Sequence, residues 1–379
     1  MEGESMSEWK EVKLGDLVTI KYGKDHKSLS DGVFPVFGSG GLMRKVDSYI
    51  YDKPSLLIPR KGTLNNIIYT EEKFWTVDTM FWTKVDELKT SAKFLYYYLK
   101  DFNFNAFNVG SAVPSLTVPV LNDIDIKLPS TDKQSDIVGI LSSLDAKIET
   151  NNKLNEKLEE MAQAIFKSWF VDFEPFKDKP FHDTELGMIP EGWEVVSLCD
   201  IANFTNGLAM QKYRPNDDEA YLPVLKIKEL RQGFCDDTSE ICTNDISEDY
   251  IAEDGDVIFS WSGTLLVDIW CGGECGVNQH LFKVTSEDYN KWFYYYWIKK
   301  HLEEFIRIAK DKAVTMGHIK REHLRNALVV VPDKKTMHNA DKIFSPIINR
   351  IIESRIESQR LASLRDTLLP RLMSGEIKI

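Results

Sequence analysis

The sequence repeats itself over almost its whole length, and this repeat constrains the fold more strongly than any other feature. The first matching positions are Trp9, Leu14, Asp16, Leu17 and Gly23 against Trp193, Leu198, Asp200, Ile201 and Gly207, all at an offset of 184. Later matches keep their order while the offset rises to 203: Phe34-Pro35-Val36 with Leu222-Pro223-Val224, Gly62-Thr63 with Gly263-Thr264, Tyr96–Tyr98 with Tyr294–Tyr296, and Leu128-Pro129 with Val331-Pro332. Insertions in surface loops produce such a drift. We therefore predict two copies of one folding unit.

Each copy divides into a globular part and a long helix. Short apolar runs broken by Gly, Pro and Asn predict strands in the globular parts, and an apolar stretch around each tyrosine triplet predicts a helix. The predicted elements are strands at Ser55–Pro59, Asp256–Ser260 and Ala327–Val331 and helices over Ser91–Lys100 and Tyr289–Phe305. The fold class is therefore α+β, with two mixed α/β globular domains in pseudo-two-fold repeat and two long antiparallel coiled-coil helices.

These elements predict five segments along the 379 residues, a length that suits two or three units with cores of their own. The predicted segments are a first globular domain over 1–130, a first long helix over 131–175, a linker over 176–192, a second globular domain over 193–332 and a second long helix over 333–379.

The first long helix carries an apolar seam with alternating steps of four and three residues, which is the pattern of helices that pack lengthwise. Its seam positions are Ile137, Leu141, Leu144, Ile148, Asn151, Asn155, Leu158, Ala162, Ile165 and Trp169. Thr131 and Gln134 are expected to cap its start as a capping box. A helix of about 36 residues would be roughly 54 Å long.

The second long helix places its seam at the same positions displaced by 203: Phe344, Ile347, Ile351, Ser354, Ser358, Leu361, Arg365, Leu368 and Leu372. Asn151 and Asn155 in the first seam thus correspond to Ser354 and Ser358 in the second. Because a buried amide opposite a leucine would be unsatisfied, we predict an antiparallel pair whose polar centre fixes the register. Pro346 is expected to start this helix afresh or to kink it, and Pro370 to loosen its last turn.

Composition excludes several classes of protein. The chain has 43% hydrophobic residues and no apolar run of about 18 residues, so we expect a globular protein that stays in the cytoplasm. Five cysteines at irregular spacing suit free thiols in a reducing compartment. Cys271, Cys275 and His280 could be imagined as part of a zinc site, but no second ligand pair accompanies them, so no metal is expected.

The net charge of −12 argues against DNA binding if it is taken alone. Two locally basic stretches, residues 21–61 and 299–325, each hold eight Lys or Arg against four Asp or Glu. A solvated surface of mixed charge is the competing interpretation of these stretches.

Catalytic signatures are missing from the sequence. It has no Walker phosphate loop, no motif for amino methylation or S-adenosylmethionine binding, no metalloprotease helix and no nucleophile elbow. Gly38-Ser39-Gly40-Gly41 lacks the Gly-Lys-Ser/Thr that would complete a phosphate loop, so a flexible turn is favoured. We therefore expect no catalytic residues in this chain.

Several motifs resemble those of type I restriction-modification specificity subunits. The junction-like motifs are Ile165–Pro175 (IFKSWFVDFEP), Glu185–Trp193 (ELGMIPEGW) and the C-terminal Leu368–Ile377 (LLPRLMSGEI). Within the second copy, Ser260–Thr264 (SWSGT), Asn278–Lys283 (NQHLFK) and Met316–Lys320 (MGHIK) are also similar to that family. The resemblance covers almost the whole chain.

The resemblance implies a non-catalytic subunit that reads a bipartite target in double-stranded DNA. Each globular domain would read one half-site, with the half-sites about one helical turn, near 34 Å, apart. The paired helices would set the gap and dock two modification subunits, which would carry the adenine methyltransferase chemistry, and a restriction subunit could join them. S-adenosylmethionine, Mg and ATP are expected on those partners, with no cofactor on this chain. Rival hypotheses are an autonomous DNA methyltransferase or nuclease and a coiled-coil adaptor without a DNA role.

Polar and cationic loop positions are the candidates for DNA contact, because Arg and Asn or Gln grip bases while Lys neutralises phosphate. In the first domain they are Lys21, Lys24, His26, Arg44, Arg60, Lys61, Thr63, Asn65 and Ser111. In the second they are Gln211, Lys212, Tyr213, Arg214, Lys226, Ser260, Ser262, Thr264, Lys312, Thr315 and His318. The tyrosine triplets are predicted to pack in the core rather than to stack on bases, with the lateral hydroxyls near the surface.

Overall fold

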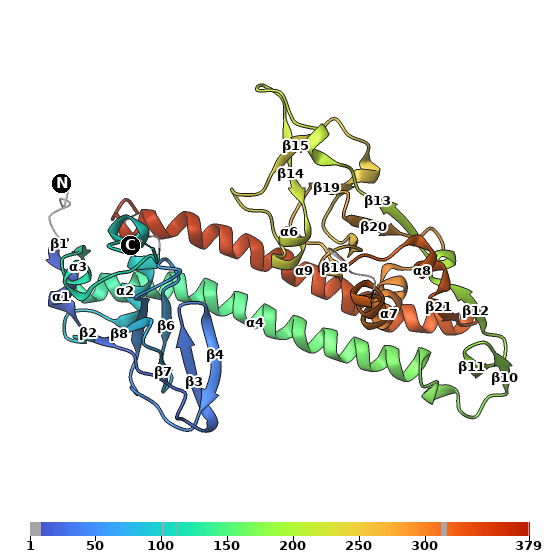
Figure 1. The fold of residues 1–379 in the computed structure, drawn as a ribbon, viewed down its shortest axis with the longest axis horizontal. Coiled ribbons are helices and arrows are strands. Elements are labelled where there is room, and N and C mark those ends of the chain that lie inside the picture. Colours follow the sequence, from blue (N-terminus) through green and yellow to red (C-terminus); the bar gives the residue numbers. More distant parts are fainter. Residues whose placement is uncertain (1–8, 101, 111, 312–316, 378) are drawn as a thin grey trace. The chain divides into compact units, whose positions relative to one another are not determined.

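The computed structural model describes residues 9–100, 102–110, 112–311, 317–377 and 379. The chain divides into two compact units, residues 1–147 with 361–379 and residues 148–360. Each unit is described by itself, with its elements labelled in Figure 1. The two long helices each run from one unit into the other, so each unit contains a part of both.

Unit 1 is an α+β domain closed by the ends of two helices. Its elements are β1 (Lys10–Lys13), α1 (Leu14–Leu17), β2 (Val18–Tyr22), β3 (Asp31–Gly38), β4 (Gly41–Val46), β5 (Ser55–Pro59), β6 (Ile68–Thr70), β7 (Trp75–Thr76), β8 (Met80–Val85), α2 (Ala92–Lys100), η1 (Phe104–Phe107), α3 (Val118–Asn122), β9 (Asp125–Leu128) and the start of α4 (Thr131–Phe170). The C-terminal part of α9 (Lys334–Met373) returns to this unit.

Unit 2 repeats the plan after the rest of α4. Its elements are η2 (Glu174–Phe176), β10 (Phe181–Thr184), β11 (Gly187–Pro190), β12 (Glu194–Ser197), α5 (Leu198–Ile201), β13 (Asn203–Asn206), η3 (Met210–Lys212), β14 (Tyr221–Leu225), α6 (Ile227–Gln232), β15 (Ile241–Thr243), η4 (Glu248–Tyr250), β16 (Ile251–Ala252), β17 (Val257–Ser260), β18 (Leu266–Ile269), β19 (Cys275–Val277), β20 (Leu281–Thr285), α7 (Lys291–Asp311), α8 (Arg321–Asn326) and β21 (Leu328–Val331).

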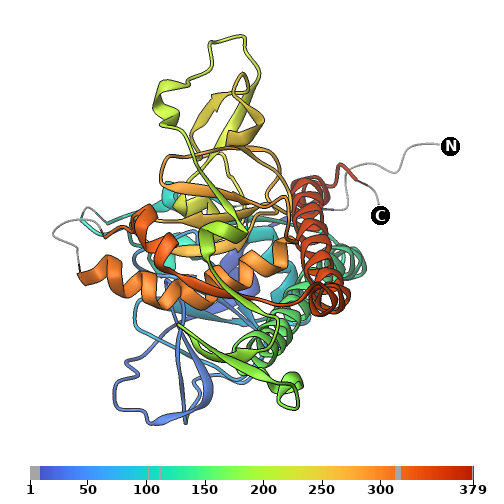
Figure 2. The same cartoon turned by 90° about the vertical axis from the view of Figure 1, so that its right-hand side faces the viewer.

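The larger sheets of the two units correspond strand by strand, and the smaller sheet has one more strand in unit 2 than in unit 1. The larger sheet has the order β2-β8-β5-β6 in unit 1 and β13-β20-β17-β18 in unit 2, with antiparallel pairing throughout. A smaller sheet, β4-β3-β7 or β15-β14-β19-β16, combines antiparallel and parallel pairs. Within unit 2, the segment with β14 and β15 projects away from the long helices in both views (Figure 1, Figure 2). The predicted α+β repeat is confirmed.

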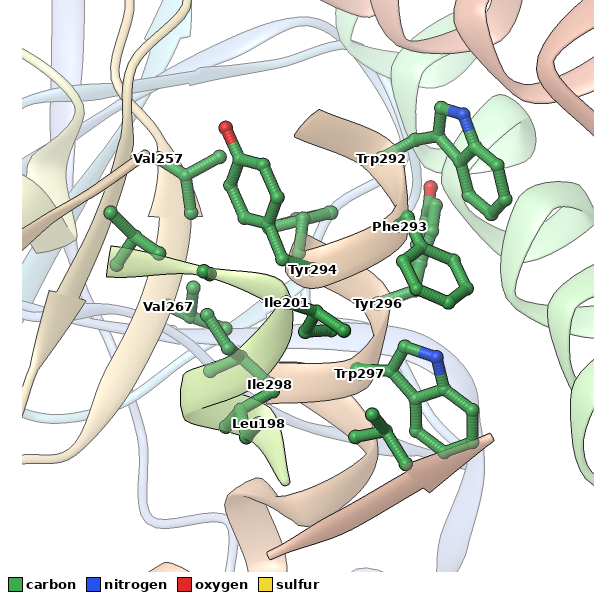
Figure 3. Packing of buried hydrophobic residues seen from close by; sticks show 14 of the residues in the cluster. Leu198, Ile201, Val257, Val267, Trp292, Phe293, Tyr294, Tyr296, Trp297 and Ile298 are labelled. Carbon is green, nitrogen blue, oxygen red and sulfur yellow. The ribbon is translucent and has the colours of Figure 1, made fainter. Parts of the chain in front are cut away.

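The tyrosine triplets belong to the cores, as predicted, because they lie on the helices that cover the larger sheets. Tyr97 is 1% exposed, and Tyr294, Tyr295 and Tyr296 are all buried. Figure 3 shows Tyr294 directed toward Val257 of the sheet, while Trp292 and Trp297 leave α7 on another side. The expectation that the lateral hydroxyls stay near the surface is wrong for the second triplet, since aromatic residues surround α7 on several sides.

The two long helices run antiparallel within each unit. In unit 2, the ring of Phe344 lies 6.3 Å from that of Phe166, near one end of the pair, while Asn151 contacts Ser354 farther along. In unit 1, Arg365 of α9 forms an ion pair with Asp145 of α4 at 2.7 Å. The predicted antiparallel helix pair is therefore present, and each helix has 40 residues.

The ends and interior of these helices differ from prediction in two ways. The capping box of Thr131 and Gln134 is wrong: Ser130 precedes the helix, and its Oγ accepts from Lys133 N at 3.5 Å. The Gln134 side chain instead donates to the carbonyls of Lys89 and Pro129. The fresh start at Pro346 is also wrong, because α9 is helical from Lys334 through Pro346 and Pro370 to Met373.

The segment expected to be a linker is ordered. β10 and β11 pair as a hairpin from Phe181 opposite Pro190 to Thr184 opposite Gly187. Phe176, just before the hairpin, packs with its ring 4.9 Å from that of Trp193. These contacts anchor the start of the second copy to the end of α4.

Candidate nucleic-acid interface

One edge of the larger sheet in unit 1 collects several of the predicted DNA-contacting residues. β2 ends at Tyr22, β5 ends at Pro59, and β8 begins at Met80, all at the same edge of the sheet. The chain that leaves β5 carries Arg60 and Lys61, whose amides both donate to Thr79 O. We call residues 21–24, 60–63, 77–79 and 114–116 the first edge.

The corresponding edge of unit 2 collects the motifs that follow β13 and β17 and precede β20. β13 ends at Asn206 and β17 at Ser260, while β20 begins at Leu281. The chain that leaves β17 carries Trp261, whose amide donates to His280 O at 3.4 Å. We call residues 205–208, 261–264, 278–280 and 317–319 the second edge.

The same backbone hydrogen bonds hold both edges. In the first edge, Gly23 N donates to Met80 O at 3.0 Å, Gly62 N to Pro114 O at 3.0 Å and Leu116 N to Arg60 O at 2.9 Å. In the second edge, the equivalent bonds are Gly207 N to Leu281 O at 2.9 Å, Gly263 N to Gly317 O at 2.9 Å and Ile319 N to Trp261 O at 3.0 Å. The isolated bridge of Lys61 with Ser115 likewise corresponds to that of Ser262 with His318. Arg60 and Trp261 therefore occupy equivalent positions.

Two glycine pairs repeat because this backbone requires them. Gly62 and Gly263 have φ of +92° and +66°, in the left-handed region that L side chains rarely adopt. A Cβ on Gly23 would lie 2.0 Å from Val77 O, and one on Gly207 would lie 2.3 Å from Val277 O. The repeated glycines thus preserve the shape of the edge while the side chains around them differ.

The first edge is cationic. The Arg60 guanidinium carbon lies 5.6 Å from the ring centroid of Tyr22, a cation–π arrangement in which the ring itself is exposed. Lys21 and Lys61, the chain neighbours of Tyr22 and Arg60, are exposed, and Thr63 follows in the same loop as Lys61. Among the predicted residues of the first domain, Lys21, Arg60, Lys61 and Thr63 belong to the segments that form this edge.

The second edge carries a tryptophan and two histidines. The Trp261 indole donates to Asn206 Oδ1 at 3.0 Å, and Ser262 Oγ is 2.9 Å from His280 Nδ1. The ring of Trp261 lies 6.1 Å from that of His280 and 6.3 Å from that of His318. Of the predicted residues, Ser262, Thr264 and His318 lie at this edge, with His318 and Thr264 exposed.

Ser260 has a different role from the one predicted. Its side chain is fully buried, and its hydroxyl donates within the turn, at 2.8 Å from Thr264 O and 3.2 Å from Ser262 O. A buried hydroxyl with these partners shapes the turn and is not available to a base.

Other predicted residues of the first domain lie on neighbouring segments. The Arg44 guanidinium on β4 donates to Leu29 O at 2.8 Å and pairs with Asp31 at 3.1 Å. Lys24 is exposed and His26 is half-buried, both in the loop after β2. Asn65 is exposed two residues beyond Thr63.

The remaining predicted residues of the second domain gather near β14 and β15. Gln211 and Lys212 are exposed on η3, and Tyr213 packs beside the small core of Met210, Val224 and Cys242. Arg214 and Lys226 both pair with Glu240, and the hydrogen bond from Lys226 lowers the pKa of that carboxyl. Their charges are therefore partly compensated within the domain.

Ser111, Lys312 and Thr315 lie outside the described residues. The residues that the sequence interpretation missed are Tyr22, Asn206, Trp261 and His280. The repeated Gly-Thr pairs at the strand ends were the signal that could have identified them, because equivalent loops place equivalent neighbours.

The imagined zinc ligands are not brought together. Cys271 and Cys275 belong to different buried clusters, and burial raises the pKa of Cys271 to about 11. His280 instead contacts Ser262. Among the residues that the structure describes, no three His, Cys, Asp or Glu side chains form a group able to hold a metal ion.

The fold and its two matched edges define a duplicated α+β protein with a long helix pair. A family model for the type I restriction modification DNA specificity domain matches residues 6–160 and 190–364, once in each copy. The chain therefore belongs to the family of type I restriction-modification specificity subunits, and the resemblance seen in its motifs is confirmed.

Relatives agree with this assignment over most of the chain. The type I restriction enzyme MjaIX specificity subunit of Methanocaldococcus jannaschii is 28% identical over 345 residues, covering 87% of this chain and 79% of the relative. The HindI specificity subunit of Haemophilus influenzae is 23% identical over 340 residues, covering 73% and 74%. The crystal structure of a type I S subunit from M. genitalium shares the fold, with a TM-score of 0.62, 16% identity and 98% coverage of both chains.

In the described part of the chain, none of the helices combines the length and the apolar composition that crossing a bilayer requires.

Proposed function

We propose that the chain reads a split sequence in double-stranded DNA, with one half-site for each globular domain. The observation that carries this proposal is the pair of edges, which share one hydrogen-bonded backbone but differ in side chains. Two domains with the same backbone at this edge but different side chains can recognise different sequences, because bases are distinguished by the donors and acceptors that contact their edges.

The first edge supports DNA binding by its charge. Lys21, Arg60 and Lys61 gather there although the whole chain has a net charge of −12. Phosphate neutralisation depends on the local arrangement of cations at the contact surface. The basic group at this edge, together with an exposed aromatic ring, suits a duplex better than a solvated surface of mixed charge.

The helix pair acts in this proposal as the spacer that sets the unread gap. A continuous helix of 40 residues is about 60 Å long at a rise of about 1.5 Å per residue, which exceeds one turn of DNA at about 34 Å. The same helices dock two modification subunits, and a restriction subunit can join the complex. The chain itself carries out no catalysis, while S-adenosylmethionine, Mg and ATP bind to the partner subunits.

Mapping methylated adenines in genomic DNA tests the proposal. The host strain with the chain is compared with the same strain lacking it, with the modification subunits expressed in both. We expect a split motif that is methylated only when the chain is present. Methylation of a continuous motif, or of the same motif in both strains, would contradict the proposal. The purified chain alone should neither bind S-adenosylmethionine nor transfer its methyl group, which separates this proposal from an autonomous methyltransferase.

A further inference from the structure

We propose that Arg60, positioned by Tyr22, reads a guanine in the first half-site, and that the equivalent position of the second edge, Trp261, does not read a guanine in this way. The inference rests on the proposed function and assigns base chemistry to one residue of the first edge. It starts from the packing of Arg60 on an exposed tyrosine.

The contacts of Arg60 hold its backbone and its guanidinium in place before any base binds. Its main chain is fixed on both sides, since Arg60 N donates to Thr79 O at 2.8 Å and Leu116 N donates to Arg60 O at 2.9 Å. Its guanidinium stacks 5.6 Å from the centre of a ring that is 54% exposed. A guanidinium oriented in this way loses less conformational entropy on binding, and its fork matches O6 and N7 of guanine.

The guanidinium of the other arginine in the first domain is already bonded within that domain. Arg44, the other arginine of the first domain, already donates to Leu29 O and pairs with Asp31. Arg60 has a cation–π neighbour but shows no ion pair with a carboxylate within the described residues. Of the two arginines in this domain, Arg60 is therefore the one whose guanidinium lies over an exposed ring and shows no carboxylate partner among the described residues.

The equivalent position in unit 2 offers different chemistry. Trp261 stands where Arg60 stands, and Asn206 stands where Tyr22 stands, as the matched hydrogen bonds show. The single indole donor of Trp261 is already bonded to Asn206 at 3.0 Å. In each edge, the residue that follows the internal strand β5 or β17 thus contacts the last residue of β2 or β13, which lies two strands away in the sheet. This residue is an arginine in the first edge and a tryptophan in the second.

The test uses the chain assembled with its modification subunits and short DNA duplexes. The duplexes carry the mapped split target or versions in which each base pair of one half-site is replaced in turn. Methyl transfer from S-adenosylmethionine is measured for the wild-type complex and for Arg60→Lys and Arg60→Gln. Arg307→Lys on α7, an exposed arginine paired with Glu304, is the matched control.

We expect replacement of one guanine in the first half-site to slow the wild-type complex by about 10- to 100-fold. Arg60→Lys should reduce that penalty to about 3-fold or less, since an ammonium keeps the charge but not the fork. Penalties in the second half-site should stay unchanged in both Arg60 variants, which also shows that the variants are folded. Arg307→Lys should keep every penalty.

Tyr22 is tested as a positioning residue at the same base pair. Tyr22→Ala should reduce the guanine penalty, and Tyr22→Phe, which keeps the ring, should restore it. A loss of stability alone would change the rate on all duplexes equally and leave the penalties intact.

Two results would overturn the inference. One is an Arg60→Lys complex with every first-half penalty preserved, and the other is an Arg60→Gln complex slowed equally on all duplexes, which marks a phosphate contact. If the wild-type complex methylates no split target, the proposed function fails. If it does and Arg60 proves irrelevant, only this inference fails.

Discussion

At the scale of single residues, Asp145 joins three elements of unit 1. Its carboxylate accepts from the Tyr97 hydroxyl of α2 at 2.6 Å and from Arg365 of α9 at 2.7 Å, while the residue itself belongs to α4. Burial raises the pKa of Tyr97, and its hydroxyl remains a donor to this carboxylate. A small group of polar side chains thus holds the globular part of unit 1 against both helices.

Asp145→Ala should lower the free energy of unfolding by about 2 kcal/mol, because it removes one of the two carboxylates that pair with the Arg365 guanidinium and leaves the buried Tyr97 hydroxyl without its acceptor. Urea unfolding measures the change. Tyr97→Phe, which removes only the hydroxyl, should cost about 1 kcal/mol. A change below about 0.5 kcal/mol in Asp145→Ala would show that the pair behaves like an exposed ion pair.

His301 gives unit 2 a pH dependence. His301 lies on α7, where its ring packs against those of Trp297 and Phe305, and its Nε2 donates to Leu328 O at 2.9 Å. Burial lowers the pKa of this histidine in the folded state. Below the unfolded-state pKa of about 6.5, the unfolded chain binds a proton that the folded chain does not, so stability falls as pH falls toward the folded-state pKa.

His301→Gln should therefore flatten the decrease of unfolding free energy as the pH falls below about 6.5. Denaturant unfolding at a series of pH values provides the measurement. His338→Gln, an exposed position on α9, is the control that should keep the wild-type slope. An unchanged slope in His301→Gln would assign the pH dependence to other groups.

At the scale of elements, periodicity predicted the helices well because burial repeats along them. The buried side of α9 continues through Pro346, with Phe344 and Ile351 of the predicted seam and with Ile348 in place of the half-buried Ile347. Burying these three side chains contributes more than the roughly 3 kcal/mol that an interior proline costs a helix. This balance explains why a sequence rule for helix ends failed at Pro346.

Pro346→Ala should raise the unfolding free energy by about 1 to 3 kcal/mol, since Pro346 is exposed and alanine restores the missing donor. Urea unfolding and helix content by circular dichroism check this result. A loss of stability would mean that α9 depends on the bend that proline introduces.

The polar layer of the helix pair was foreseen in part. Asn151 is fully buried, and its amide donates to Glu357 at 2.9 Å and to Ser358 Oγ at 3.3 Å. Matching polar gaps in two seams indicated this meeting, but the participation of Glu357 could not be read from a seam pattern. Asn155 Oδ1, by contrast, is buried and finds no hydrogen-bond partner among the residues that the structure describes. The register role of the layer stays a prediction.

The site was less predictable than the fold. Lys61 and Thr63 could be chosen from residue type, but Trp261 was noted only as part of a motif until the matched hydrogen bonds placed it at the position equivalent to Arg60. Residue chemistry alone also favoured Arg44, whose partners Leu29 and Asp31 come together only when the β3–β4 hairpin folds. Long-range pairing decides which polar side chains are already satisfied.

At the scale of the whole molecule, the duplication gives one chain two domains with the same backbone plan, which the proposed function uses to read two half-sites. Each copy keeps the glycines and backbone bonds that shape an edge and exchanges the side chains that the edge presents. In the proposed function, the helices between the copies determine the gap and the edges determine the bases.

Removal of seven residues from each long helix should shorten the methylated motif's unread gap, because one heptad keeps the seam in phase while reducing helix length by about 10 Å. Methylome mapping of the variant gives the gap directly. The two half-sites themselves should stay the same. A gap of unchanged length would contradict the spacer role.

The proposed function requires that each copy reads its own half-site. The most direct measurement exchanges residues 6–190 for the corresponding segment of another specificity subunit and maps the methylated motif of the resulting complex. We expect one half-site to change to that of the donor while the other is retained. A motif in which both half-sites change, or neither does, would contradict the proposed function.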